Sequence, residues 1–205
     1  MKERPILFSA PMVRAILGGQ KTQTRRIIKP QPDTTLEDYP YWHIGGFRLR
    51  KDAKNPLRSP YGVPGDRLWV RETWSPDHRD VYPNFPIVYR ADGYPSDDDI
   101  SGGMLETGDA MICRRTYFRW RPSIHMPRHA SRINLEVTDV RVERLQNISE
   151  ADALADGGWT YSACPIHKSP QRSFADLWES INGKGSWNVN PWIWALSFRK
   201  IDPVT

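Results

Sequence analysis

The hydrophobic pattern of the chain predicts several short strands. Residues 4–9 and 67–74 are strand-like, and residues 20–28 run from a polar turn into β-branched side chains. Residues 131–142 alternate apolar and polar side chains, with a one-residue change of phase near Thr138 that predicts a bulge or a corner. A closing strand is expected where four apolar residues alternate with their neighbours: Trp192, Trp194, Leu196 and Phe198.

A different spacing predicts three helices between these strands. Pro11 suits the first turn of a helix that ends at Gly18-Gly19, and Ser149 is a suitable N-cap for a second helix that ends at Gly157-Gly158. In the third helix the apolar side chains recur at i, i+3, i+4 and i+7, which places Phe174, Leu177, Trp178 and Ile181 on one face. Short strands without βαβ repetition predict an α+β fold centred on a small mixed β-barrel.

Two long stretches interrupt this pattern. Residues 30–65 contain Pro30, Pro32, Pro40, Pro56, Pro60 and Pro64, and residues 75–120 contain an acidic run and a Gly-Gly pair, with one strand candidate at residues 87–90. We interpret both as irregular insertions in a single domain that spans residues 1–205.

Composition predicts a folded protein of the cytoplasm. The chain of 205 residues is 39% hydrophobic and 11% aromatic, too rich in large apolar side chains for a disordered chain. No apolar run approaches the roughly 20 residues that cross a bilayer, and the N-terminus lacks the apolar stretch of a signal peptide, so no membrane partner is expected. Cys113 and Cys164 have no paired spacing, and we expect both to be free thiols in a reducing compartment.

Basic charge is concentrated in part of the chain. The net charge is +5, and residues 114–132 hold six arginines and no acidic residue. In this stretch guanidinium groups alternate with aromatic rings, so Arg119 and Arg121 are candidates for binding phosphates while bases stack on the rings. The alternative is an exposed strand with a solvated basic face.

Three side chains are candidates for chemistry: Lys21, Thr24 and Glu72. Lys21 and Thr24 are three residues apart after the first helix and can point the same way. Glu72 shares a strand face with Leu68 and Val70, and on an inward face its carboxylate would be desolvated and would pair with a nearby ammonium. The alternative is an ordinary surface Glu and Lys.

Two segments together resemble a known family. Gly18-Gly19-Gln20-Lys21-Thr22-Gln23-Thr24-Arg25 and Pro64-Gly65-Asp66-Arg67-Leu68-Trp69-Val70-Arg71-Glu72-Thr73-Trp74 are similar to the paired signature of ASCH-domain proteins, in the PUA-like superfamily, and the whole resembles members encoded by bacteriophages and prophages. The resemblance implies a PUA-like β-barrel that holds a nucleotide, a modified nucleoside or RNA.

The resemblance also implies roles for residues. In the bacterial ASCH enzyme that hydrolyses N4-acetylcytidine, a Lys and a Thr of the first motif and a Glu of the second form the catalytic set. The resemblance therefore assigns the role of base to Lys21, of nucleophile to Thr24 and of acid to Glu72. We expect a hydrolase that cleaves an amide on a modified base, without metal or cofactor. The alternatives are a PUA-like RNA-binding module without chemistry, and a ribonuclease.

Further residues are expected to contact the substrate or nucleic acid. Arg25 or Arg26 is a candidate for anchoring a phosphate or orienting the base, while Arg25 is equally suited to a structural ion pair. Arg71, His125 and Arg128 complete the candidate binding set, with His125 either at the pocket mouth or bonded to a loop carbonyl. Cys164 and His167 have a spacing that supplies only half of a structural zinc site.

Overall fold

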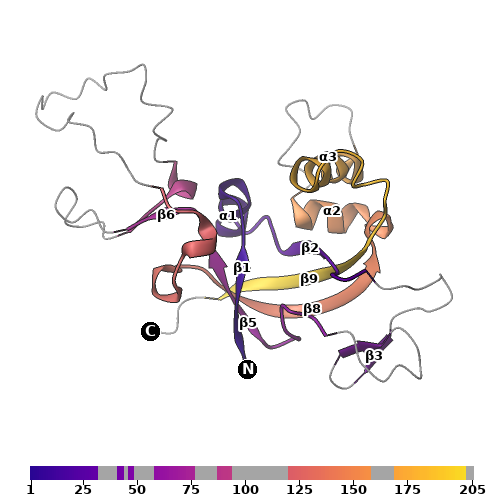
Figure 1. Cartoon of the computed structure of the whole chain (residues 1–205), viewed down its shortest axis with the longest axis horizontal. Coiled ribbons are helices and arrows are strands. Elements are labelled where there is room, and N and C mark those ends of the chain that lie inside the picture. Colours follow the sequence, from indigo (N-terminus) through magenta and orange to yellow (C-terminus); the bar gives the residue numbers. More distant parts are fainter. Residues whose placement is uncertain are drawn as a thin grey trace, which may run out of the picture.

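The computed structural model describes residues 1–31, 41–43, 46–48, 58–76, 87–93, 120–157 and 169–201. These residues form an α+β fold in which helices pack on a five-stranded mixed sheet (Figure 1). The sheet contains β1 (Glu3–Leu7), β5 (Arg67–Arg71), β8 (Asn134–Arg144), β9 (Trp192–Ile201) and β2 (Gln23–Ile27), in that order. β1 and β5 are parallel, and the other neighbours are antiparallel.

The long strands β8 and β9 form the centre of the sheet. Their register shifts between Val137 and Asp139, which confirms the bulge predicted from the change of phase in the sequence. An extra residue in one strand bends it and increases its twist. The bulge therefore helps β8 to pair with β5 at one end and to remain beside β9 along its length.

The sheet is open, and here the structure differs from the expected barrel. β1 and β2 are the two edge strands, and the described residues show no backbone pairing between them. A side chain links them instead, because the Arg26 guanidinium donates a hydrogen bond of 2.5 Å to the Leu7 carbonyl oxygen. Because this contact is made by a side chain and not by backbone pairing between β1 and β2, the sheet does not close into a barrel.

Each of the three predicted helices is confirmed. α1 (Ala10–Leu17) has a proline in its first turn, as the sequence indicated. α2 (Glu150–Asp156) is capped by Ser149, whose hydroxyl accepts from the Asp152 amide at 3.1 Å, and α3 (Pro170–Asn182) is capped in the same way by Ser169. Gly157 ends α2 with a φ of 103°, a conformation that L side chains rarely adopt.

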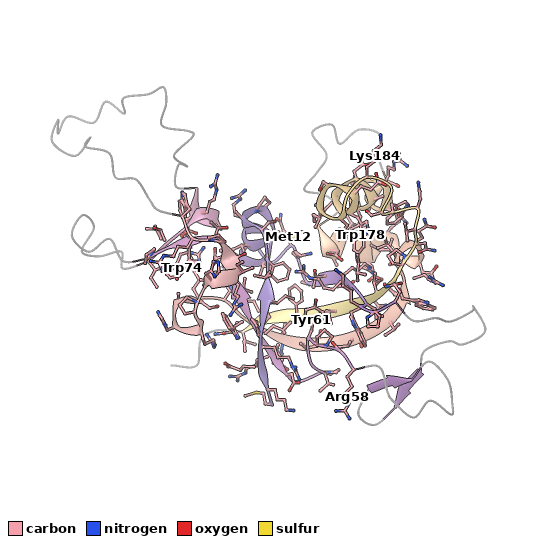
Figure 2. All side chains as sticks on the ribbon, viewed as in Figure 1. Met12, Arg58, Tyr61, Trp74, Trp178 and Lys184 are labelled. Atoms are coloured by element: carbon pink, nitrogen blue, oxygen red, sulfur yellow. The ribbon has the colours of Figure 1, made fainter. Side chains whose placement is uncertain are left out.

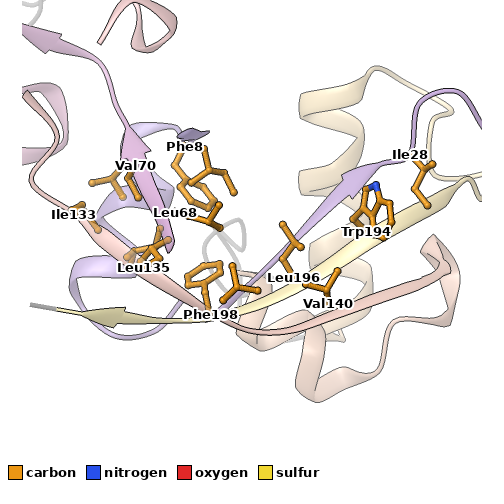
Figure 3. Packing of buried hydrophobic residues seen from close by; sticks show 14 of the residues in the cluster. Phe8, Ile28, Leu68, Val70, Ile133, Leu135, Val140, Trp194, Leu196 and Phe198 are labelled. Carbon is orange, nitrogen blue, oxygen red and sulfur yellow. The ribbon is translucent and has the colours of Figure 1, made fainter. Parts of the chain in front are cut away.

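Two apolar clusters hold the helices on the sheet, and alternate residues of β9 supply them. Trp194, Leu196 and Phe198 join the larger cluster with residues of β1, β5 and α1 (Figure 3). Ile193 and Ala195 join the second cluster, which contains Phe174 and Trp178 of α3 and residues of α2. Both faces of β9 are therefore buried, which fixes α1 and the α2–α3 pair relative to the sheet.

The rest of the described chain consists of short elements. β3 (Tyr41–His43) pairs with β4 (Gly46–Arg48), so the insertion expected at residues 30–65 includes a two-stranded sheet. The predicted strand at residues 67–74 is in fact divided, with β5 ending at Arg71 and β6 (Trp74–Ser75) pairing with β7 (Val88–Tyr89). Short 3₁₀ helices complete it: η1 (Arg90–Asp92), η2 (Ser123–His125), η3 (Arg128–Ala130) and η4 (Leu145–Asn147). Within the described ranges, each helix is too short or too polar to cross a bilayer.

Candidate functional site

A cleft lies between α1 and α3, beside the edge strand β2. It contains two cavities of about 500 and 230 Å³, which share Met12, Asp156, Leu177 and Ile181 in their walls. Met12 and Trp178 lie on opposite sides of the gap between the helices (Figure 2). The larger volume is in the range of small-molecule sites, roughly 300–1,000 Å³.

Lys21 lies in the wall of the smaller cavity and is only 2% exposed. The turn after α1 places it there, because the amides of Gln20 and Lys21 both donate to the Ala15 carbonyl oxygen. The Lys21 ammonium donates to the carboxylate of Asp156 at 2.5 Å and to its backbone carbonyl at 2.6 Å. Lys21 thus interacts with the negative C-terminal end of α2 and with an acidic side chain at the same point.

The ionisation of Lys21 is set by two opposing effects. Burial lowers the pKa of the Lys21 ammonium from its ordinary value, and the Asp156 carboxylate acts in the opposite direction. The nearby positive charges of Arg25 and Arg26 lower this pKa further. A lysine with a lowered pKa can release its proton more readily than a surface lysine, as a general base requires.

Thr24 and its neighbours on β2 form the wall of the larger cavity. Thr24 is buried opposite Leu196 of β9, and residues 24–29 all contribute to this cavity. Asp156 belongs to both cavities and so connects the Lys21 and Thr24 regions. The structure therefore brings the lysine and the threonine of the first motif to one cleft.

Arg25 is surrounded by carboxylates. Its guanidinium is within ion-pair distance of Glu143 at 3.0 Å, Asp152 at 3.3 Å and Asp156 at 3.1 Å. Its side chain is fully buried, and three carboxylates compensate its charge. Of the two roles considered for Arg25, this geometry matches the structural ion pair.

Glu72 lies apart from this cleft, although it is only 1% exposed. Its carboxylate accepts hydrogen bonds from the Arg132 guanidinium at 3.0 and 3.1 Å, and Arg132 also binds Asp92 at 2.9 and 2.7 Å and stacks on Tyr89. Burial raises the pKa of Glu72, and the bonds from Arg132 oppose that effect. Glu72 lines neither cavity, so the described structure does not place it with Lys21 and Thr24.

Of the other candidate binding residues, Arg26 lines the larger cavity, whereas Arg71, Arg121, His125 and Arg128 line neither cavity. Arg71 and Arg128 both lie over the ring of Trp69, and Arg71 donates to the Ile124 carbonyl oxygen at 3.2 Å. Arg121 lies over Trp74, and His125 is exposed at the end of η2. Four residues considered in the sequence analysis lie outside the described residues: Arg119, Cys113, Cys164 and His167.

Sequence reasoning missed Asp156. A signal for it exists, because a carboxylate in the last turn of a helix opposes the helix dipole and calls for a compensating cation. Asp156 directly precedes the glycine that ends α2, and Lys21 and Arg25 supply that cation. It also missed the aromatic lining of the larger cavity, which comes from distant segments: Tyr61, Phe174, Trp178 and Trp194.

No family model, curated protein or solved structure matches the chain. Within the residues that the structure describes, no group of three or more His, Cys, Asp or Glu side chains could hold a metal ion. The features that indicate a function are therefore the cleft and the resemblance of the two sequence motifs.

Proposed function

We propose that the cleft binds a modified nucleobase, as a nucleoside or within RNA, and hydrolyses an acyl amide on it. One observation carries this proposal: a buried lysine and a buried threonine of the first motif share a cleft lined by aromatic and basic side chains. Aromatic rings suit a planar base, and a desolvated lysine in the same cleft as a hydroxyl suits acyl transfer. An N4-acylcytosine is the substrate class that the resemblance implies.

The proposed reaction has two steps. Neutral Lys21 takes the proton of the Thr24 hydroxyl, and the Thr24 oxygen forms a bond to the acyl carbon while the bond from that carbon to the exocyclic nitrogen breaks. The departing amine takes a proton either from Lys21 or, as the resemblance assigns, from Glu72. In the second case the proton that Lys21 took from Thr24 returns through solvent to Glu72, so that Lys21 is neutral again on both routes. Water then attacks the acyl-threonine ester, loses a proton to Lys21 and releases the carboxylic acid together with free Thr24.

Asp156 orients Lys21 in this mechanism. Two of the three ammonium donors point at Asp156, one at its carboxylate and one at its backbone carbonyl. When Lys21 is neutral, the remaining position is a lone pair, which can accept the proton of the Thr24 hydroxyl. Asp156 is held in turn by Arg25 at 3.1 Å, so the orientation of Lys21 depends on the buried ion-pair network of α2 and β2.

The proposal extends to the fold and the compartment. A PUA-like assignment is supported by the five-stranded mixed sheet and by the Arg26 contact that joins its two edge strands. Cytoplasmic location is supported by the two cysteines, which have no paired spacing in the sequence.

The experiment is a product assay on the purified chain. N4-acetylcytidine, other acylated nucleosides and short RNAs carrying the same base are incubated with the protein, and products are identified by mass spectrometry. We expect free acid and the deacylated base, with turnover lost in Thr24→Ala and kept in Thr22→Ala, an exposed threonine two residues away. Hydrolysis that survives Thr24→Ala would contradict the covalent step, and no hydrolysis of any substrate would contradict the proposed reaction.

A second candidate function has its own supporting observation. Both buried charges of the two motifs already have an ion-pair partner in the structure. Lys21 is paired with Asp156, and Glu72 is paired with Arg132. Groups satisfied in this way suit a PUA-like module that recognises a base without altering it. In the same assay this module would bind the acylated nucleosides or RNAs and return them unchanged.

A further inference from the structure

The charges around the larger cavity are unequal. Four basic residues line it, Arg25, Arg26, Lys29 and Arg58, against a single acidic residue, Asp156. Asp156 is already bonded to Lys21 and Arg25. Among the described residues, no carboxylate forms an ion pair with Arg26, Lys29 or Arg58, which leaves three positive charges without a compensating acid on this wall.

Arg26 is the best placed of the three to contact a ligand. Its guanidinium lies over the Phe8 ring at 5.3 Å and donates to the Leu7 carbonyl oxygen, contacts that hold the group in a fixed position. Its Nε atom is buried and has no hydrogen-bond partner within the described part of the chain. A guanidinium has five N–H donors in a planar fork that matches the oxygens of a phosphate.

Lys29 and Arg58 complete the arrangement at the cavity rim. Both side chains are exposed, and they come from different segments, Lys29 just after β2 and Arg58 just before the turn that leads to β5. Tyr61 and Trp178 line the same cavity, and their rings offer flat apolar surfaces on which a base can stack. A basic rim beside aromatic surfaces has the composition of a nucleotide site rather than of a site for an uncharged nucleoside.

We propose that Arg26, with Lys29 and Arg58, forms a phosphate subsite, so that the ligand of this cleft is a nucleotide and not a free nucleoside. The inference rests on the proposed function and narrows its substrate class. The phosphate has two sources, a nucleoside monophosphate or the backbone of an RNA strand. Both present the same anionic oxygens to Arg26, and affinity for both falls as salt rises.

The test measures ligand binding to the purified protein, with ligands that carry no acyl amide and therefore stay intact. Cytidine, cytidine 5′-monophosphate and a short cytidine-containing RNA are titrated by calorimetry at two salt concentrations. We expect the monophosphate to bind about tenfold or more tightly than cytidine, as charge-assisted hydrogen bonds to phosphate predict. Arg26→Gln should remove most of this preference, and Lys29→Ala and Arg58→Ala should each remove a smaller part.

Two controls keep the result interpretable. Arg26→Lys keeps the charge and should retain part of the preference for the monophosphate, which a mere folding defect would not restore. Arg172→Gln changes an exposed arginine on α3 that lies outside both cavities, and it should alter nothing.

The outcomes separate this inference from the proposed reaction. Equal affinities for cytidine and its monophosphate, or a preference that persists in Arg26→Gln, would overturn the phosphate subsite even if amide hydrolysis is found. An Arg26-dependent preference in a protein that hydrolyses no acylated base would keep the subsite and reject the hydrolase. RNA that binds more tightly than the monophosphate identifies a strand as the source of the phosphate, and equal binding identifies a nucleotide.

Discussion

Lys21 and Glu72 are both buried ionisable residues of the two sequence motifs, but their surroundings differ. Lys21 is paired with Asp156 in the wall of the smaller cavity. Glu72 is paired with Arg132, which in turn binds Asp92 of η1, and it lines neither cavity. Burial favours the neutral form of each side chain, so it lowers the pKa of Lys21 and raises the pKa of Glu72.

The comparison shows that a shifted pKa and a position beside a cavity are separate properties of a buried side chain. Burial next to a single counter-ion perturbs both groups in a similar way, and a perturbed group is a candidate for function. Only the position beside a cavity makes such a group available to a substrate. We infer that Lys21 and Thr24 perform the chemistry, and that Glu72 contributes either as the acid for the leaving amine or by holding η1 against the sheet.

The largest expected effect distinguishes these roles through turnover. Lys21→Met and Thr24→Ala should each lower the rate of amide hydrolysis about 100-fold or more, and the double variant should be hardly worse than either, because a nucleophile without its base is already inactive. Glu72→Gln should cause a comparable loss only if Glu72 protonates the leaving amine. Lys184→Met, on an exposed lysine, is the matched control for steady-state kinetics.

Additive losses in the double variant would show that Lys21 and Thr24 act separately. A rate unchanged in Glu72→Gln would assign the protonation step to Lys21 and leave Glu72 with its structural contact.

The next effect concerns stability on the Glu72 side. Arg132→Met leaves the Glu72 carboxylate buried without its partner, and we expect a loss of about 3 kcal/mol in the free energy of unfolding at neutral pH. Since the folded protein raises the pKa of Glu72, its stability contribution is present at low pH and is lost as pH rises through that pKa. The loss in Arg132→Met should therefore shrink on acidification, as chemical denaturation at several pH values would show.

The double variant Glu72→Gln with Arg132→Met removes both charges and should recover much of this stability. If instead the double variant is as unstable as Arg132→Met, the cost arises from lost packing on Tyr89 and not from the unpaired carboxylate.

The smallest effect is a shift of a pH profile on the Lys21 side. The Asp156 carboxylate raises the pKa of Lys21, while Arg25 and Arg26 lower it, so Asp156→Asn should lower this pKa further. If neutral Lys21 is the base, the acid limb of the profile of kcat/KM moves to lower pH. Asp156→Glu keeps the charge and should keep the limb near its original position; a limb that stays in place in Asp156→Asn would exclude Lys21 as the group that titrates.

Local patterns predicted much of the fold. The helix signals at Ser149 and Pro11 and the change of phase near Thr138 depend on neighbouring residues only, and each appears in the structure. The division of the strand after Arg71 did not follow from the sequence, because it depends on pairing between β6 and β7, which are distant along the chain. The barrel was expected both from the short strands without βαβ repetition and from the family resemblance, and the open sheet differs from it.

The candidate site was predictable in part for a similar reason. Lys21 and Thr24 belong to one short motif, so their common cleft follows from local geometry after α1. Asp156 contacts Lys21 across 135 positions of sequence, and Arg132 contacts Glu72 across 60. Such partners depend on how the helices and strands pack, which hydrophobic spacing does not specify.

A crystal structure of Thr24→Ala with N4-acetylcytidine 5′-monophosphate would test the central claim most directly. We expect the base beside Met12 and Trp178, the acyl carbonyl next to position 24 and Lys21, and the phosphate on Arg26. A ligand bound outside the cleft, or bound within it with the acyl group turned away from Lys21 and position 24, would contradict the account.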